Sequence, residues 1–294
     1  MGLVKLKVER AVRLSASRVP IGWVLEDPRF KTLMGDTLLR VRGRARRYRA
    51  AVIPVYKSTS SDAAEGFITV HDVLLARSFA STRRVGSVVR RWPLATFEES
   101  VSRAYELMSR YGLPGILVVD DLARRSVVGL VTALGLLREL MYMDPPEEAR
   151  PVSSSYTELG DGVISLHWRE PVTRVIDEIA GGRVLGVVVV NDEGGPQGTI
   201  TVWDLIRTGK WFTRSEHGPK AVMGAAQVSR GESRRVGVMR VQRLMRRGVP
   251  AAAMETPMRS VMRFMASTGI ELVPVVDGDG VVRGAVTLRD ALRE

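Results

Sequence analysis

The stretch Gly284-Ala-Val-Thr-Leu-Arg-Asp290 decides the fold, because its pattern recurs along the chain. Gly66-Phe-Ile-Thr-Val-His-Asp72 and Gly198-Thr-Ile-Thr-Val-Trp-Asp204 have the same form, and Gly129-Leu-Val-Thr-Ala-Leu-Gly135 departs from it at the last position, where glycine replaces the acid. A glycine, two strand-forming residues, a threonine and an acid three residues later are typical of a strand that runs into a helix. Recurrence of such a pattern predicts a repeat architecture.

The residues around the last copy predict a complete structural unit. Val261, Met262 and Met265 have helical spacing, and Thr256 is expected to cap that helix with Pro257 at its first position. Residues 271–276 predict a strand, 277–280 a tight turn and 281–286 the returning strand. Met254, Met258, Met262 and Met265 are interpreted as core residues.

The three earlier copies predict the same order of elements. In the first, Asp36 is expected to cap a helix over 37–47, with Tyr48 on its inner face and arginines on its outer face: Arg40, Arg42, Arg44, Arg46, Arg47 and Arg49. In the second, Thr96 and Glu99 predict a capping box. In the third, Pro171 is expected to open a helix that Gly181-Gly182 ends.

The sequence thus predicts an α/β fold of four β-α-β-β-α units in two pairs. The expected segments are an N-terminal piece (1–17), repeat 1 (18–79), repeat 2 (80–144), a proline-rich linker (145–155), repeat 3 (156–209), a basic insertion (210–235) and repeat 4 (236–294).

Composition narrows the class of protein. The formal net charge is +12 and most of it is arginine, which favours anionic partners such as nucleotides, nucleic acid or an acidic protein surface. The chain has no cysteine, which excludes disulfide and thiolate chemistry. We expect no membrane span and no signal peptide, and we expect a cytoplasmic protein.

These repeats resemble CBS domains, units of roughly sixty residues named after cystathionine β-synthase. The resemblance is carried by Pro-Val-Val-Asp at 274–277, by Leu-Val-Val-Asp at 117–120 and by the recurrent Gly-x-x-Thr-x-x-Asp ending. It covers nearly the whole chain apart from the N-terminal piece, the linker and the insertion. It implies that units pair through their sheets into Bateman modules, and that two modules stack into a disc within one chain or between two chains.

The resemblance also implies a ligand. Clefts in Bateman modules commonly bind adenosine derivatives, namely AMP, ADP, ATP, S-adenosylmethionine and sometimes NAD. The motif acid then holds the ribose hydroxyls, and the threonine lies near the ribose or phosphate. Carried over to this chain, the expected binding residues are Thr69, His71, Asp72, Thr132, Thr201, Asp204, Thr287, Arg289 and Asp290.

Elementary chemistry supports that assignment and also offers an alternative. A carboxylate such as Asp290 can accept hydrogen bonds from both ribose hydroxyls, and Arg289 beside it can pair with a phosphate. However, Thr-x-x-Asp is also a helix cap that needs no ligand. At Gly135 both the cap partner and the ribose acceptor are missing, so the second cleft is expected to be empty or degenerate. Trp203 can stack on a base or simply pack, and packing is favoured.

No motif indicates catalysis or a metal site. His71, His167 and His217 lack ligand spacing, and no nucleophile–base arrangement is recognisable. We therefore expect a regulatory protein that binds an adenine nucleotide, is not an enzyme, and acts on an unidentified protein partner.

A nucleic-acid-binding protein is the alternative hypothesis. Residues 210–247 are strongly basic, with ten lysines or arginines: 210, 214, 220, 230, 234, 235, 240, 243, 246 and 247. No aromatic residue lies between Lys220 and Pro250 to stack on a base. No helix-turn-helix pattern is visible either, so this alternative is not favoured.

Overall fold

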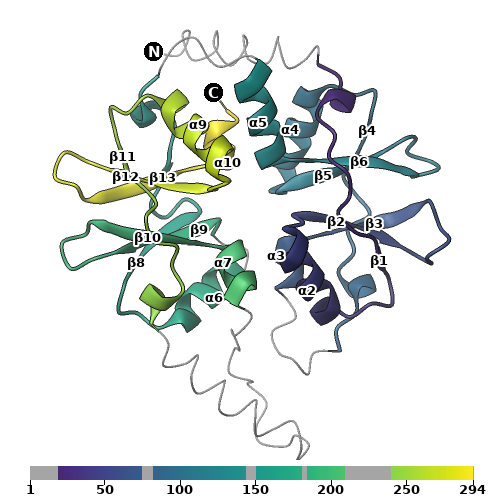
Figure 1. Ribbon diagram of the computed structural model, residues 1–294, viewed down its shortest axis with the longest axis horizontal. Helices are drawn as coiled ribbons and strands as arrows, with labels where there is room; N and C mark the ends of the chain where they lie inside the picture. The colour runs from purple at the N-terminus through teal and green to yellow at the C-terminus, as the bar shows by residue number, and fades with distance from the viewer. Residues whose placement is uncertain (1–18, 75–81, 144–149, 181–183, 209–239, 294) are drawn as a thin grey trace, which may run out of the picture.

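The computed structural model describes residues 19–74, 82–143, 150–180, 184–208 and 240–293, which form four similar units (Figure 1). Unit 1 contains β1 (Thr32–Leu33), α2 (Leu38–Tyr48), β2 (Val52–Tyr56), β3 (Ala64–Thr69) and α3 (Val70–Val73). Unit 2 contains β4 (Leu94–Thr96), α4 (Val101–Tyr111), β5 (Gly115–Val119), β6 (Val127–Thr132) and α5 (Ala133–Met143).

The second half of the chain repeats this order. Unit 3 contains β8 (Val163–His167), α6 (Val172–Ala180), β9 (Gly186–Val190), β10 (Pro196–Thr201) and α7 (Val202–Thr208). Unit 4 contains β11 (Ala252–Ala253), α9 (Met258–Thr268), β12 (Leu272–Val276), β13 (Val282–Thr287) and α10 (Leu288–Ala291). In every unit the first strand pairs parallel to the second and the third antiparallel to it. The predicted β-α-β-β-α fold class is confirmed.

The units associate in pairs and the pairs meet through their helices. The sheets of units 1 and 2 contact each other through β2 and β5, and those of units 3 and 4 through β10 and β12. Helices close the middle of the molecule, where α2 meets α7 and α5 meets both α9 and α10 (Figure 1). One hydrophobic cluster joins Ile116 to Val273, and another joins Leu74 to Leu205, so apolar cores cross from one half to the other.

Four segments that lead into the units cross to the neighbouring unit of the same pair. We call residues 19–27, 82–91, 151–158 and 240–247 the crossing segments. The first and second are exchanged between units 1 and 2, through the bridges Glu26–Leu130 and Phe67–Arg90. The third and fourth are exchanged between units 3 and 4, through the pairs Ala285–Thr157 and Thr199–Arg246.

This exchange explains the glycine of the repeated motif. A Cβ atom at Gly66, Gly198 or Gly284 would overlap the main-chain carbonyl oxygen of Arg90, Arg246 or Thr157 respectively. At Gly129 the carbonyl oxygen of Glu26 would lie 3.1 Å from the added atom. The motif begins with glycine because a crossing backbone lies directly against it.

Several helix starts differ from the sequence predictions. Thr37, not Asp36, caps α2, because the Asp36 carboxylate accepts from the backbone N–H of Leu33 and the hydroxyl of Thr32. Ser100 caps α4, whereas Thr96 ends β4 and exchanges hydrogen bonds with Glu99 through its backbone N–H and carbonyl. The N-cap position of α9 is Pro257, so the predicted Thr256 cap is wrong.

The predicted faces of α2 need two corrections. Tyr48 is 42% exposed and lies beside Phe30, whereas it was expected to face the core. Arg42 is buried although it was assigned to the outer face. The assignment of the methionines is confirmed: Met258, Met262 and Met265 are buried, and Met254 packs against the same cluster.

Several predictions lie wholly or mostly outside the described residues. These are the N-terminal segment 1–17, most of the linker, the Gly181-Gly182 helix end and the insertion 210–235. The domain boundaries as a whole stay predictions.

Candidate functional site

In all four units the motif threonine takes part in hydrogen bonds at the strand-to-helix corner, and units 1 and 4 have the same complete set. Thr69 and Thr287 accept from the backbone N–H of Asp72 and Asp290, and each aspartate accepts in return from the backbone N–H of its threonine, so both corners are complete capping boxes. In unit 3 Asp204 accepts from the N–H and the hydroxyl of Thr201. The motif therefore stabilises helix starts whether or not a ligand binds.

In three corners the crossing segment also supplies a partner for the motif acid. Arg90 donates to both carboxylate oxygens of Asp72, at 2.8 and 3.1 Å. The Arg246 guanidinium lies 3.9 Å from Asp204, and the Thr157 hydroxyl donates to Asp290 at 2.8 Å. These three acids are buried, with exposures of 6%, 1% and 2% in chain order. A ribose at one of these corners would compete with a protein partner already present.

In the corner of unit 2 the carboxylate belongs to the crossing segment and not to the motif. The motif of this unit ends in Gly135, and the carboxylate there comes from Glu26 of the crossing segment. Glu26 accepts a hydrogen bond from the hydroxyl of Thr132, which in turn accepts from the N–H of Gly135 at 3.0 Å. The expectation that this corner lacks a carboxylate is wrong. Nothing in the local motif could reveal Glu26, which precedes Thr132 by 106 residues.

A central cavity of about 420 Å³ opens at this corner. Glu26, Thr132 and Gly135 line one side of it. Residues of all four units line the rest, among them the cations Arg47 and Arg49, Trp203 and the loop at Gly269. Arg29 and Arg138 bring the arginines in this lining to four, against the acids Glu26, Asp27 and Glu271. The excess of arginine over acid suits an anionic ligand.

A smaller, mainly apolar cavity of about 110 Å³ adjoins the central one. It collects the predicted residues Thr201, Thr287 and Arg289, together with apolar side chains of α4 and α10. The two cavities share His71 and Glu271 in their walls. Thr132 and His71 thus line the central cavity, whereas Asp72 and Asp290 line neither of these two cavities and Asp204 lines only a much smaller recess.

Burial shifts the pKa values of His71 and Glu271, the two titratable side chains that line both cavities. Burial lowers the pKa of His71, and the nearby Arg90 lowers it further against the opposing effect of Asp72. Burial raises the pKa of Glu271, although its carboxylate accepts a 2.8 Å hydrogen bond from the indole N–H of Trp203 and lies near Arg49. Trp203 is 8% exposed and packs in the core of unit 3, as the packing interpretation predicted.

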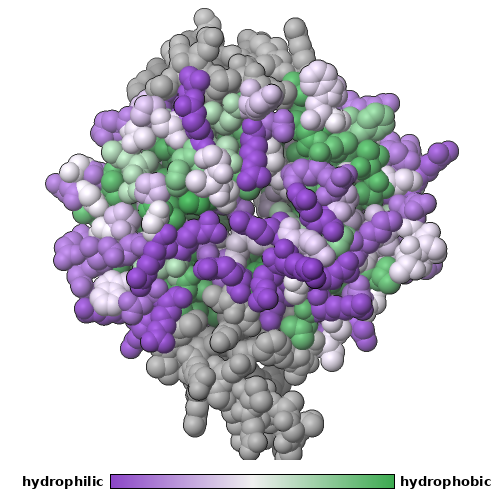
Figure 2. Space-filling model, viewed as in Figure 1, coloured by the Kyte–Doolittle hydropathy of each residue, from purple (hydrophilic) through white to green (hydrophobic). Residues whose placement is uncertain are grey.

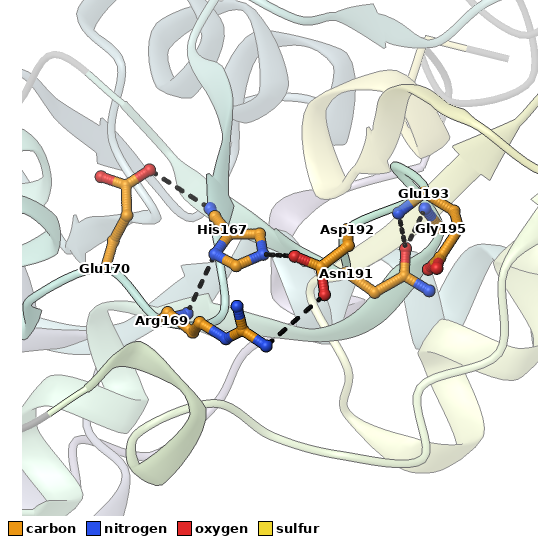
Figure 3. Close-up of polar contacts among 7 residues, drawn as sticks. All are labelled: His167, Arg169, Glu170, Asn191, Asp192, Glu193 and Gly195. Atoms are coloured by element: carbon orange, nitrogen blue, oxygen red, sulfur yellow. Dashed lines mark hydrogen bonds and ion pairs between the residues drawn. The ribbon is translucent and has the colours of Figure 1, made fainter.

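The remaining described histidine lies elsewhere. His167, at the end of β8, contacts Asp192 at 3.0 Å, and Arg169 lies 3.7 Å from the same carboxylate (Figure 3). Asn191 in this turn accepts from the backbone N–H groups of Glu193 and Gly195 (Figure 3). This cluster organises the turn between β9 and β10. Within the described ranges, no group of three or more His, Asp or Glu residues is arranged to hold a metal ion.

Hydrophilic side chains cross the middle of one face of the molecule (Figure 2). Across the part of the chain that the structure describes, no helix combines the length and apolar character needed to cross a bilayer. Cytoplasmic location stays a prediction.

Comparisons with known proteins agree with this architecture. A family model described as "CBS domain" matches residues 85–142 and 241–294. Protein MJ1225 from Methanocaldococcus jannaschii has a similar structure, with a TM-score of 0.76 at 18% identity over 94% of this chain and 99% of that one. An uncharacterized conserved protein from Pyrococcus horikoshii matches with a TM-score of 0.60 at 18% identity, with the same coverage of both chains.

One curated relative is an enzyme, inosine-5'-monophosphate dehydrogenase from Aquifex aeolicus. It is 24% identical over 156 residues, which are 53% of this chain and 30% of the dehydrogenase. The chain thus matches less than a third of that enzyme. The matched family model thus identifies residues 85–142 and 241–294 as two CBS domains, within a fold of four equivalent units whose sheets pair.

Proposed function

We propose that this protein is a regulatory protein that binds an adenine nucleotide in its central cavity. The observation that carries the proposal is the composition of that cavity: a threonine–carboxylate corner on one side and four arginines around it. Its volume of about 420 Å³ lies within the range of about 300–1,000 Å³ usual for small-molecule sites.

The two ends of a nucleotide have different requirements. A ribose offers adjacent hydroxyl donors, which suit a carboxylate acceptor. Phosphates need cations, and the planar guanidinium groups of Arg29, Arg47, Arg49 and Arg138 can pair with them. This excess of arginine favours ADP and ATP over AMP, and all three over S-adenosylmethionine.

Regulation would follow from where the cavity lies. Its walls come from all four units, so a bound nucleotide contacts both halves of the chain at once. A ligand shifts a conformational equilibrium only when it binds one conformation more tightly than another. We propose that nucleotide binding changes the relative position of the two halves, and that a protein partner binds one arrangement of the halves more tightly than the other. Protein MJ1225, which shares the fold, is itself described as a proposed archaeal homologue of γ-AMPK.

A thermal-shift and calorimetry panel of AMP, ADP, ATP and S-adenosylmethionine tests the proposal. A ligand at a hundred times its dissociation constant should stabilise the protein by about 2.7 kcal/mol. Arg29→Gln and Arg47→Gln should each weaken ATP binding about 5- to 10-fold and weaken AMP binding less. Arg263→Gln, an exposed position of α9 that does not line the cavity, is the matched control. Absence of binding by every nucleotide would refute the proposal.

Binding of nucleic acid is the alternative that the same protein preparation can test. Most of residues 210–247 lie outside the described ranges; among the rest, Arg246 lies beside Asp204, and Arg240 donates to the carbonyl of Arg169. Salt-dependent retention on duplex DNA or RNA that disappears when the basic residues of 210–247 are neutralised would favour this alternative.

A further inference from the structure

We propose that Glu26 supplies the ribose-binding carboxylate of unit 2, in place of the missing motif acid, and that the corner of unit 2 is the principal nucleotide site. This inference rests on the proposed function and deepens it. It reverses the expectation that the Gly135 repeat carries a degenerate cleft.

The first argument is the equivalence of the four crossing residues. Arg90, Glu26, Arg246 and Thr157 each pair with the residue two positions before the motif threonine, namely Phe67, Leu130, Thr199 and Ala285. The crossing residue therefore occupies the same backbone position at the corner of every unit. Where the motif ends in aspartate, the crossing residue is a donor, and where it ends in glycine, the crossing residue is a carboxylate.

The second argument is the fit between Glu26 and Gly135. The backbone of Glu26 is fixed by two hydrogen bonds with Leu130, at 2.8 and 3.0 Å. Its carboxylate then lies where a side chain at position 135 would begin, because a Cβ atom built on Gly135 would overlap it. Thr132 donates its hydroxyl to this carboxylate, just as Thr287 donates to Asp290. The glycine and the glutamate are complementary changes at a single corner.

The third argument is access. Glu26 and Thr132 are both partly exposed and both line the central cavity. The equivalent threonines Thr69, Thr201 and Thr287 are buried, as are their aspartates. Arg90 contacts both oxygens of Asp72, whereas Thr132 contacts a single oxygen of Glu26. Of the four equivalent corners, this one combines a carboxylate with an opening onto the 420 Å³ cavity.

The chemistry of the ligand follows from this arrangement. A carboxylate that faces a cavity accepts hydrogen bonds from adjacent hydroxyls, and the arginines around the same cavity pair with phosphate. The ligand class is a ribonucleotide whose ribose hydroxyls are free. A deoxyribonucleotide keeps the base and phosphates but loses one of the two donors to Glu26.

The decisive measurement is the ratio of the dissociation constants of 2'-deoxy-ATP and ATP, obtained by calorimetry on the full chain. Wild-type protein should prefer ATP at least tenfold, and Glu26→Gln should reduce that preference to less than threefold. Loss of a negative charge would by itself strengthen binding of an anion, so the ratio is a better test than affinity. Asp27→Asn removes a charge from the same cavity and should leave the ratio unchanged.

A transplanted corner gives an independent test. The double variant Glu26→Ala/Gly135→Asp moves the carboxylate to the motif and leaves out a crossing-segment donor of the kind by which Thr157 engages Asp290. It should restore a carboxylate to the corner and recover most of the preference for ATP that Glu26→Gln loses. The single variant Gly135→Asp should not bind ATP, because the new side chain would overlap the carboxylate of Glu26.

The possible failures are distinguishable. If wild-type protein binds no adenine nucleotide, the proposed function fails and this inference fails with it. If wild-type protein binds ATP but Glu26→Gln keeps the full ratio, the inference alone is wrong. A ratio that collapses instead in Asp290→Asn would place the ribose at the corner of unit 4 and also overturn it.

Discussion

In unit 1 an arginine of the crossing segment meets a carboxylate of the motif, whereas in unit 2 a carboxylate of the crossing segment meets a glycine. The backbone is the same in both corners, with the same bridge position and the same capping threonine. What differs is which chain segment carries the acid. When the motif carries it, a donor from the other segment engages it. When the crossing segment carries it, the acid lines a cavity.

Removal of Arg90 should have the largest effect on stability, because Asp72 would remain buried without its main partner. We expect Arg90→Leu to lower the free energy of unfolding by about 2 kcal/mol, a value that allows for the 44% exposure of the arginine side chain and for the bonds that Thr69 keeps. Urea denaturation measures the change. Arg246→Leu should cost less, since its contact is 3.9 Å and Arg207 also lies near Asp204. Equal losses would show that the ion pair in unit 1 is not stronger.

In unit 4, loss of the partner of Asp290 should lower stability less than loss of Arg90 does in unit 1, because that partner, Thr157, is uncharged. Thr157→Val keeps the shape of the side chain but removes the hydroxyl that donates to Asp290. We expect a loss of about 1 kcal/mol in urea denaturation, since Thr287 still donates to the same carboxylate. Thr157→Ser, which retains the hydroxyl, should lose less than half as much. If the two variants behave alike, the hydrogen bond contributes nothing.

Substitution of Glu271, in the wall of the central cavity, should have a smaller effect on stability, and one that depends on pH. Burial raises the pKa of its carboxyl above the ordinary 4.5, so between 4.5 and the raised value the folded protein holds a proton that the unfolded chain has released. The stability that this proton contributes is present below pH 4.5 and is lost as the pH rises through the folded pKa.

Glu271→Gln removes this dependence while an amide oxygen can still accept from Trp203. The variant should therefore gain stability relative to wild-type protein as the pH rises from 5 to 8 in urea denaturation. A difference that stays constant over this range would contradict the raised pKa.

Local pattern was sufficient to predict the architecture. The Gly-x-x-Thr-x-x-Asp stretch encodes a strand, a cap and a helix within seven residues, and its repetition gave the number and order of the units. Exact helix starts were less predictable where two capping residues are adjacent. Asp36 and Thr37 both suit an N-cap, and the choice depends on Thr32 and Leu33, which engage the Asp36 carboxylate in a turn.

The candidate site was less predictable because its decisive contacts are long-range. The sequence predicted a corner without an acid at Gly135, whereas Glu26 fills it from 106 residues before Thr132. Similarly, Asp290 and Thr157 are separated by 133 residues. A single sequence contains no signal for which segment crosses to which unit, because every crossing segment is short and its backbone partners lie far away in the chain.

The exchange of crossing segments has a consequence for how such a chain can be divided or enlarged. A fragment that holds one repeat would carry a crossing segment without the neighbouring unit that it pairs with. Its own motif glycine would face solvent instead of a crossing backbone. Cutting the chain between two repeats of a pair would therefore leave an unpaired crossing segment and an uncovered glycine, and duplicating a single repeat would add a second set of both. The smallest portion of this chain that can be inherited, expressed or transplanted intact is a pair of repeats.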